Sequence, residues 1–199
     1  MTIRAIFFDL GGVILRTEYQ APRERLAERM NMTYEDLNRI VFESDSSRKA
    51  SIGVMSADEH WAAVTRRLGR PASETANIRE EFFAGDLLDR GLLDFIRSLR
   101  PRYKTGVISN AWPDLRTYLV ENKFEDAFDA LIVSAEVGVM KPEPKIYQIA
   151  LEQLNIKPEE AVFVDDISSN VDAARTLGMQ GILFRNPEQT MSKLKEMLN

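Results

Sequence analysis

The segment Ala5–Leu15, AIFFDLGGVIL, carries the strongest indication of the fold. It begins with four apolar residues, continues through Asp9 and the pair Gly11-Gly12, and ends in a second apolar run. A short apolar run without strict alternation is typical of a strand that is buried on both faces of a sheet. We therefore predict a buried strand over Ala5–Phe8, with Asp9 at its carboxyl end and both glycines in the loop that follows.

Four further apolar runs have the character of buried strands, namely Thr105–Ile108, Ala130–Val133, Ala161–Val164 and Gly181–Phe184. Helical patterns lie between these runs, at Leu115–Asn122, Lys145–Leu154 and Ser169–Leu177. The last pattern is followed by Gly178, a residue type that commonly ends helices. Because strands that alternate with helices form parallel sheets through right-handed crossovers, the sequence predicts an α/β fold with a doubly wound parallel sheet.

The first two predicted strands are separated by roughly ninety residues, although one crossover needs only about a dozen. This stretch contains helical patterns at Ala21–Met30, Tyr34–Phe42, Ser56–Leu68 and Ala76–Phe83. Thr33 with Asp36, and Ser56 with Glu59, have the spacing of helix caps. A further pattern, Leu92–Leu99, leads into the second strand. We predict a small all-helical cap over residues 16–85, inserted into an α/β core formed by residues 1–15 and 86–199.

The composition is that of an ordinary folded domain, with 44% hydrophobic and 29% charged residues in a chain of 199. The net charge is −5 and no cluster of five Lys or Arg occurs, which argues against nucleic acid as a partner. The amino terminus lacks the layout of a signal peptide, and the apolar runs are too short to cross a membrane. We expect a cytoplasmic protein without a membrane partner, while composition does not decide the oligomeric state.

The residue types that commonly bind zinc are almost missing from this chain. The absence of cysteine excludes disulfides and thiolate metal sites. The single histidine, His60, lies in a helical pattern and makes a zinc site or a histidine base implausible. We expect His60 to be an ordinary surface or half-buried residue.

Polar side chains follow four of the predicted strands. Asp9 follows the first strand, Ser109-Asn110 the second, Lys141 lies in the loop region after the third, and Asp165-Asp166 follows the fourth. Ligands of open α/β sheets bind beyond the carboxyl ends of the strands, so we expect these groups to meet. Carboxylates suit Mg²⁺, while a hydroxyl, loop amides and a lysine can hold phosphate oxygens. The set predicts phosphoryl transfer, in which Asp9 attacks phosphorus and water hydrolyses the resulting aspartyl-phosphate.

Each of these residues also has an explanation that involves no catalysis. A lone Asp after a strand is usually a turn or cap residue, and Ser109-Asn110 could cap a helix. Lys141 could be a solvated loop lysine. Asp165-Asp166 is harder to explain in this way, because adjacent carboxylates at the end of an apolar strand repel each other unless a cation lies nearby. The presence of all four groups in this order favours a functional site.

The sequence resembles the haloacid dehalogenase (HAD) superfamily, in the subfamily with a helical cap inserted after the first strand. Four motifs carry the resemblance in order, at residues 6–15, 106–110, 138–147 and 162–166, the last followed by Asn170 and Ala173-Ala174. They span nearly the whole predicted core. The resemblance implies that Asp9 is the catalytic nucleophile and that Lys141 is the catalytic lysine of the third motif. It also implies that Ser109 binds the phosphoryl group of the substrate together with Lys141, and we expect Asn110 to face the substrate.

The resemblance further implies a magnesium site. Asp9, the backbone carbonyl of Gly11 and Asp166 would hold the ion, with Asp165 as a carboxylate behind them. Which of Asp165 and Asp166 binds the metal directly stays open at this point.

One position departs from the pattern of the family's phosphatases. These enzymes usually carry a second Asp where this chain has Gly11, and that Asp protonates the leaving alkoxide, an effect worth about 10²–10⁴ in rate. Our first hypothesis is a Mg²⁺-dependent phosphomonoester hydrolase acting on a small phosphorylated metabolite such as a sugar phosphate. The alternatives are a catalytically weakened protein that binds a phospholigand or a protein partner, and a 2-haloacid dehalogenase. The acidic pair Asp165-Asp166 disfavours the dehalogenase, because a departing halide gains nothing from neighbouring carboxylates.

Overall fold

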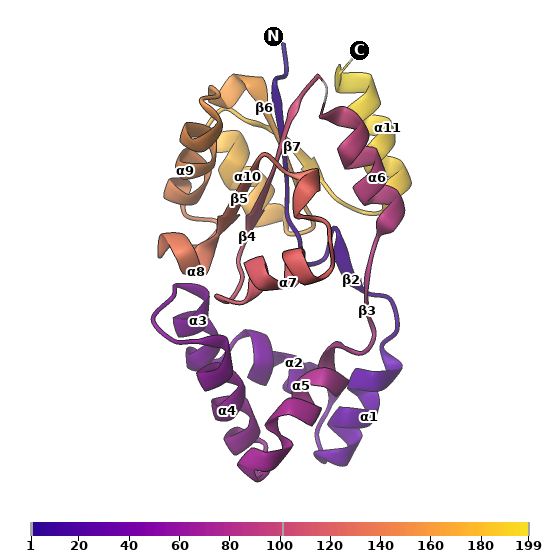
Figure 1. The fold of residues 1–199 in the computed structure, drawn as a ribbon, viewed down its shortest axis with the longest axis vertical. Helices are drawn as coiled ribbons and strands as arrows, with labels where there is room; N and C mark the ends of the chain where they lie inside the picture. Colours follow the sequence, from indigo (N-terminus) through magenta and orange to yellow (C-terminus); the bar gives the residue numbers. More distant parts are fainter. Residues whose placement is uncertain (1, 101, 199) are drawn as a thin grey trace.

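The structure is a computed structural model that describes residues 2–100 and 102–198. A five-stranded parallel sheet flanked by helices forms its upper part in Figure 1, and a separate group of helices forms the lower part. The strand order is β5-β4-β1-β6-β7, with bounds β1 Ala5–Phe8, β4 Lys104–Ser109, β5 Ala130–Val133, β6 Ala161–Asp165 and β7 Gln180–Leu183. The chain runs from β1 to β4 and β5 and then crosses to β6 on the other side of β1. The prediction of a doubly wound α/β fold is confirmed.

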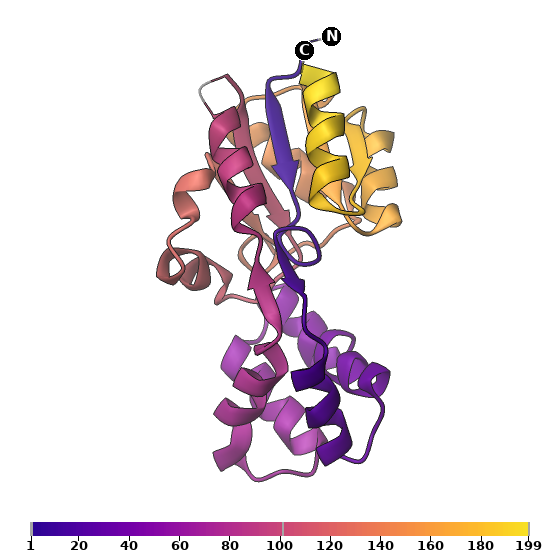
Figure 2. The same ribbon diagram turned by 90° about the vertical axis from the view of Figure 1, so that its right-hand side faces the viewer.

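The central strand β1 is buried on both faces, and each of its four residues is 0% exposed. Ile6 and Phe8 join one hydrophobic cluster, while Ala5 and Phe7 join a second. Helices cover both faces (Figure 2), with α6 (Arg90–Leu99) and α11 (Pro187–Leu198) on the first and α9 (Pro144–Leu154) and α10 (Ser168–Thr176) on the second. This double burial is the physical reason for the continuous apolar run in the sequence.

The predicted core elements agree with the observed ones to within one or two residues. No strand boundary differs by more than one residue; for β7 the sequence predicts Gly181–Phe184 and the structure has Gln180–Leu183. Helices α7 (Leu115–Glu121), α8 (Ser134–Val137) and α11 complete the core. The sequence predicts α7, but no pattern in it indicates α8 or α11. None of the helices formed by the described residues has the length and apolar character needed to cross a membrane.

Five helices build the lower part of the molecule, α1 (Ala21–Arg29), α2 (Tyr34–Phe42), α3 (Asp45–Ser51), α4 (Ala57–Arg67) and α5 (Thr75–Phe83). They enclose a hydrophobic cluster of their own around Trp61 and Phe82. The predicted capping box is present, because the Ser56 hydroxyl accepts from the Glu59 amide and the Glu59 carboxylate accepts from the Ser56 amide. Helix α3 was not predicted, since its sequence DSSRKAS has no apolar periodicity and packs through small residues.

A two-stranded antiparallel ribbon connects this helical cap to the sheet (Figure 2). Its strands are β2 (Leu15–Thr17) and β3 (Asp86–Leu88). Arg16 ties the ribbon to the start of α6, because its guanidinium pairs with Asp89 at 2.9 Å. The predicted boundary at residues 15/16 falls inside β2, and the one at 85/86 lies at the start of β3. Because the ribbon belongs to both parts, the division into core and cap stays a prediction.

The cap also touches the core through the loop that follows β4. The indole of Trp112 lies against the cap cluster, with ring centroids 4.4 Å from His60, 5.8 Å from Trp61 and 6.1 Å from Phe42. On the same loop Asp114 forms an ion pair with Arg79 of α5. The segment that follows Ser109 is therefore anchored in the cap.

The expectation that His60 is a surface or half-buried residue is wrong. Its side chain is 0% exposed and packs against both Trp61 and Trp112. Nδ1 is 2.9 Å from the hydroxyl of Ser46. Burial lowers the pKa of His60 to about 4, because the apolar surroundings disfavour the imidazolium. The physical reason for the error is that the hydrophobic cluster includes Trp112 from the core, whose contact with the cap helix no sequence pattern reveals.

The buried neutral imidazole makes the stability of the fold dependent on pH. His60 titrates near 6.5 in the unfolded chain and at about 4 in the folded protein, so the unfolded state binds more protons between these values. This contribution is fully present above pH 6.5 and is lost as the pH falls to 4, by about 3 kcal/mol. We expect a His60→Gln variant to lack this loss when urea unfolding is measured from pH 7 to 4. Parallel curves for the native protein and the variant would contradict the assignment.

Candidate active site

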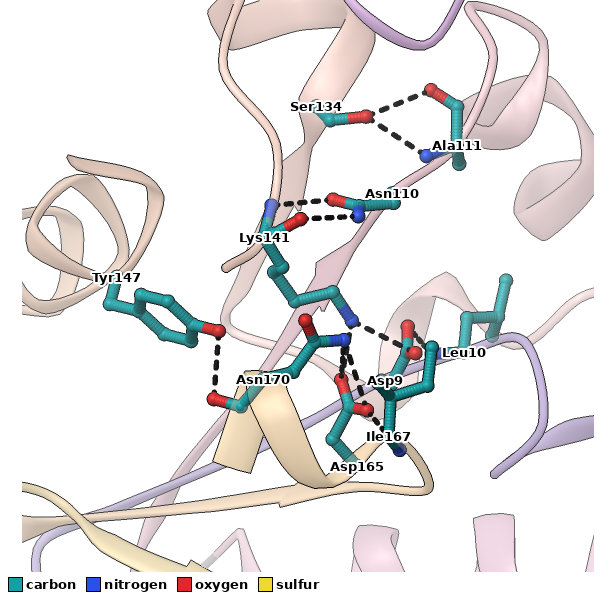
Figure 3. A network of polar contacts seen from close by, with 10 residues as sticks. All are labelled: Asp9, Leu10, Asn110, Ala111, Ser134, Lys141, Tyr147, Asp165, Ile167 and Asn170. Carbon is teal, nitrogen blue, oxygen red and sulfur yellow. Dashed lines mark hydrogen bonds and ion pairs between the residues drawn. The ribbon is translucent and has the colours of Figure 1, made fainter. Parts of the chain in front are cut away.

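The carboxyl ends of the central strands bring most of the predicted site residues together. Asp9 directly follows β1, Ser109 is the last residue of β4, and Asp165 is the last residue of β6. Lys141 reaches this edge from the loop before α9 (Figure 3). The order of β4, β1 and β6 as neighbours in the sheet explains why residues so distant in sequence meet here.

Lys141 lies between two carboxylates. Its Nζ is 2.8 Å from Asp9 Oδ2 and 2.7 Å from Asp165 Oδ2 (Figure 3). The side chains of Lys141, Asp9 and Asp165 are 1%, 10% and 0% exposed. A lysine this deeply buried needs partners of opposite charge, so the explanation of Lys141 as a solvated loop residue is wrong.

The ionisation of Asp9 is finely balanced. Burial raises the pKa of Asp9 to about 6, Lys141 opposes this rise, and the negative charge of Asp165 adds to it. A hydrogen bond from the Leu10 amide to Oδ1, 2.7 Å long, also favours the carboxylate. Asp9 is therefore ionised at neutral pH, and a cation bound beside it would hold it in that form at lower pH.

The two adjacent carboxylates of β6 have different surroundings. Both oxygens of Asp165 accept from Asn170 Nδ2, at 3.2 and 3.1 Å, and Oδ1 also accepts from the Ile167 amide. With Lys141 added, Asp165 has a full set of protein partners. Asp166 is exposed and lies against Gly12, where a Cβ atom would overlap its carboxylate. Partial burial and the neighbouring charge of Asp165 raise the pKa of Asp166.

The oxygen atoms at this edge fit a divalent cation of the magnesium type. Asp9, Asp165 and Asp166 each offer one carboxylate oxygen, and these atoms lie within 4.8 Å of one another. Hard oxygen donors of this kind are those that Mg²⁺ takes from proteins. In the described part of the chain no backbone amide bonds to the Gly11 carbonyl, so this oxygen is available as a further ligand. Burial is the main cause of the raised pKa values of Asp9 and Asp166, and the negative charge of Asp165 adds to both rises.

Ser109 and Asn110 have different positions at the end of β4. Ser109 is buried at the site edge, 3% exposed. Asn110 is exposed, and its side-chain amide already bonds to Lys141, with Nδ2 donating to the Lys141 carbonyl at 2.9 Å and Oδ1 accepting from the Lys141 amide at 2.7 Å. The Asn110 amide retains one N–H and one lone pair for another partner. Substrate binding by Ser109 and Asn110 stays a prediction.

Two residues of the site were not assigned a role from the sequence, although both lie in recognised motifs. Asn170 of α10 holds both oxygens of Asp165, and Tyr147 of α9 donates its hydroxyl to the Asn170 carbonyl at 2.9 Å (Figure 3). Burial, with the charges of Asp165 and Asp9 nearby, raises the pKa of Tyr147, so it stays a neutral donor. The spacing of Asn170 from Asp166 gave a signal for its proximity, whereas nothing in the sequence indicates the tyrosine hydrogen bond.

Removal of the Lys141 ammonium should destabilise the folded protein, because Asp9 and Asp165 would then repel each other. A Lys141→Met variant retains the apolar stem but leaves Asp9 and Asp165 buried without their cation. We expect it to unfold in urea with a free energy about 3–5 kcal/mol below that of the native protein at pH 8 in EDTA. Excess Mg²⁺ should reduce the difference, because the ion replaces part of the lost positive charge. A change below about 1 kcal/mol in EDTA would contradict the buried ion-pair assignment.

The comparison with known proteins agrees with this geometry. Residues 3–178 match a family model described as haloacid dehalogenase-like hydrolase. D-ribitol-5-phosphate phosphatase of Bacteroides thetaiotaomicron is 27% identical over 99% of both chains. Bifunctional epoxide hydrolase 2 of Rattus norvegicus is 30% identical over 98% of this chain, which spans 39% of that protein's length. A HAD family enzyme of B. thetaiotaomicron, solved with magnesium and inorganic phosphate, superposes with a TM-score of 0.78, at 22% identity over 92% of this chain and 94% of that chain.

The family match extends over most of the chain and includes all four motifs that surround the carboxylate and lysine cluster. The structural neighbour shares the fold independently of the sequence match. The chain belongs to the haloacid dehalogenase-like hydrolases.

Proposed function

We propose that this chain is a Mg²⁺-dependent phosphomonoester hydrolase that acts on a small phosphorylated metabolite through an aspartyl-phosphate at Asp9. The observation that carries the proposal is the Asp9–Lys141–Asp165 array at the sheet edge, with Asp166 beside it. It combines a nucleophile, a cation for phosphate oxygens and oxygen ligands for a metal in one place. The name of the relative D-ribitol-5-phosphate phosphatase supports a sugar phosphate or similar molecule as substrate.

In the proposed reaction a carboxylate oxygen of Asp9 attacks phosphorus, and the bond from phosphorus to the leaving oxygen breaks. Lys141 balances the negative charge that develops on the phosphoryl oxygens, and Ser109 at the end of β4 donates a hydrogen bond to one of them. Asn170 and Tyr147 hold Asp165, and through it Lys141, in place. A water molecule then attacks phosphorus and releases Asp9 and inorganic phosphate.

The metal site would consist of Asp9, the Gly11 carbonyl and Asp166. Asp166 is the better candidate for a direct ligand than Asp165, because the oxygens of Asp165 are already bonded to Lys141, Asn170 and the Ile167 amide. When bound, Mg²⁺ would offset the repulsion between the substrate's phosphate and the carboxylates of the site.

Of the described residues, those at positions 11, 18 and 165 are the candidates for a general acid that protonates the departing alkoxide, and none of the three is suited to that role. Gly11 has no side chain to offer, and Glu18, the other carboxylate on this segment, is exposed and bonds to Arg16 at 2.9 Å. Asp165 is fully occupied by its partners. The proton must therefore come from water or from the substrate itself, so the reaction depends on how well the leaving group carries negative charge.

Substrates with good leaving groups should react faster for this reason. We expect kcat/KM for aryl phosphates and anomeric sugar phosphates to exceed that for simple alkyl phosphates by about 10²–10⁴, the usual contribution of a general acid. Initial rates on matched pairs, such as an anomeric phosphate and the 6-phosphate of one sugar, measure the ratio. Equal rates on both classes would mean that an acid is present after all.

The direct test of the proposed function is release of phosphate from p-nitrophenyl phosphate, with Mg²⁺ and with EDTA. Turnover that requires the metal supports the proposal. A folded protein that binds Mg²⁺ but shows no turnover on aryl or sugar phosphates would favour a phospholigand-binding role, and turnover that is unaffected by EDTA would exclude the proposed metal site.

A further inference from the structure

The side chain of Asn110 bonds to the backbone of Lys141 like one residue of a paired strand. Its Oδ1 accepts from the Lys141 amide at 2.7 Å and its Nδ2 donates to the Lys141 carbonyl at 2.9 Å (Figure 3). The two residues are 31 positions apart in sequence. Such a two-point contact fixes both the position and the orientation of the backbone at Lys141.

Lys141 lies in a segment that has little regular structure to hold it. The residues between α8, which ends at Val137, and α9, which begins at Pro144, form neither helix nor strand. Pro142 and Pro144 carry no N–H and cannot donate backbone hydrogen bonds. Among the described residues, the Lys141 amide and carbonyl have the Asn110 side chain as their hydrogen-bond partner. Asn110 therefore replaces the ladder of hydrogen bonds that a strand or helix would provide.

Asn110 is itself held in place from its other side. The hydroxyl of Ser134, which is 0% exposed at the start of α8, accepts from the Ala111 amide at 3.0 Å and donates to the Ala111 carbonyl at 3.2 Å (Figure 3). The loop after β4 is thus bonded to the end of β5 on one side and to Lys141 on the other. These bonds link two neighbouring strands of the sheet to the catalytic lysine.

We propose that Asn110 is a positioning residue that acts through Lys141, rather than a residue whose main role is to contact the substrate. A lysine side chain has four rotatable bonds, and its ammonium reaches both Asp9 and Asp165 only if the backbone of Lys141 is correctly positioned. The two hydrogen bonds from Asn110 fix that backbone position. This inference rests on the proposed function and deepens it, because it assigns the origin of the lysine geometry that phosphoryl transfer needs.

The test is a double-mutant cycle with Asn110→Ala and Lys141→Met. In the native background we expect Asn110→Ala to lower kcat on p-nitrophenyl phosphate by about 10–100-fold, with KM changed by less than about threefold, since a small displacement of a catalytic group acts on the transition state. In the Lys141→Met background the same substitution should have no further effect, because the group it positions is gone. Asn110→Asp should also be impaired, since a carboxylate accepts from the Lys141 amide but cannot donate to its carbonyl.

Binding of inorganic phosphate in the presence of Mg²⁺, measured by calorimetry, provides a second readout for variants with too little activity. Asn110→Ala should weaken phosphate binding in the native background and leave it unchanged in Lys141→Met. Asn122→Ala is the matched control, because Asn122 also bonds to a backbone carbonyl, that of Tyr118, but lies at the end of α7. It should be native-like in both measurements, and thermal unfolding should show that each variant folds.

Two results would overturn the inference. An equal loss in kcat/KM or phosphate affinity from Asn110→Ala in both backgrounds would show that Asn110 contacts the substrate itself. Native values for Asn110→Ala would show that Lys141 needs no such anchor. Failure of the proposed function has a different signature, because the native protein would then show no metal-dependent turnover while the phosphate-binding cycle could still be measured.

Discussion

Replacement of Asp9 by Asn should abolish Mg²⁺-dependent phosphate release, with a fall in kcat of about 10⁴-fold or more. The carboxamide is nearly the same size as the carboxylate and can still accept from the Leu10 amide, so the local fold should persist. It is a poor nucleophile and carries no charge, and therefore it can neither form the acyl phosphate nor serve as an anionic metal ligand. Phosphate release from p-nitrophenyl phosphate measures the effect.

Asp172→Asn is the matched control for this substitution. Asp172 is an exposed aspartate whose partner is Arg175, and the ion pair lies on the surface of α10. We expect native turnover for this variant. A comparable loss in Asp172→Asn would indicate a general sensitivity to charge, and activity retained in Asp9→Asn would require another nucleophile.

A Gly11→Asp variant should gain activity on simple alkyl phosphates, by about 10²–10⁴ in kcat/KM. A Cβ atom built at Gly11 meets no heavy atom within 4 Å, and the backbone there does not adopt a left-handed conformation, so a side chain fits without strain. The neighbouring carboxylates should raise the pKa of the new acid and keep it protonated when the leaving group departs. The gain should be smaller on aryl phosphates, which need little protonation.

Gly11→Asn separates proton donation from the effect of filling the space. The carboxamide has the shape of the new acid but no proton to give at neutral pH, so this variant should not gain activity. If Gly11→Asp loses activity on every substrate class, the site is built around the glycine, and the missing acid is not what limits the native protein. The phospholigand-binding alternative predicts no turnover in the native protein and measurable turnover only in the Gly11→Asp variant.

The parallel sheet could be predicted because its strands are buried on both faces. The apolar runs that become β1, β4, β5 and β6 leave little choice of structure, and the long interval after β1 requires an insertion. The rule that ligands bind at the carboxyl edge of such a sheet then places Asp9, Lys141 and Asp165 together from their positions in the chain.

What the sequence did not reveal depends on contacts between distant residues. The β2–β3 ribbon pairs residues 69 to 73 positions apart through three-residue strands, which leave no periodic pattern. Helix α3 is polar and packs through small side chains. His60 is buried because it packs against Trp112, and the side-chain amide of Asn110 is bonded to the backbone of Lys141. Neither contact can be inferred from residue type or spacing.

The central claim is that a phosphoryl group passes through Asp9. Native protein mixed with Mg²⁺ and p-nitrophenyl phosphate can be quenched in acid and treated with borohydride, which reduces an aspartyl-phosphate to homoserine. With so good a leaving group we expect hydrolysis of the intermediate to be the slow step, so mass spectrometry should find homoserine at position 9, and none in EDTA or in Asp9→Asn. Turnover with reduction at a different carboxylate, or at none, would contradict the account.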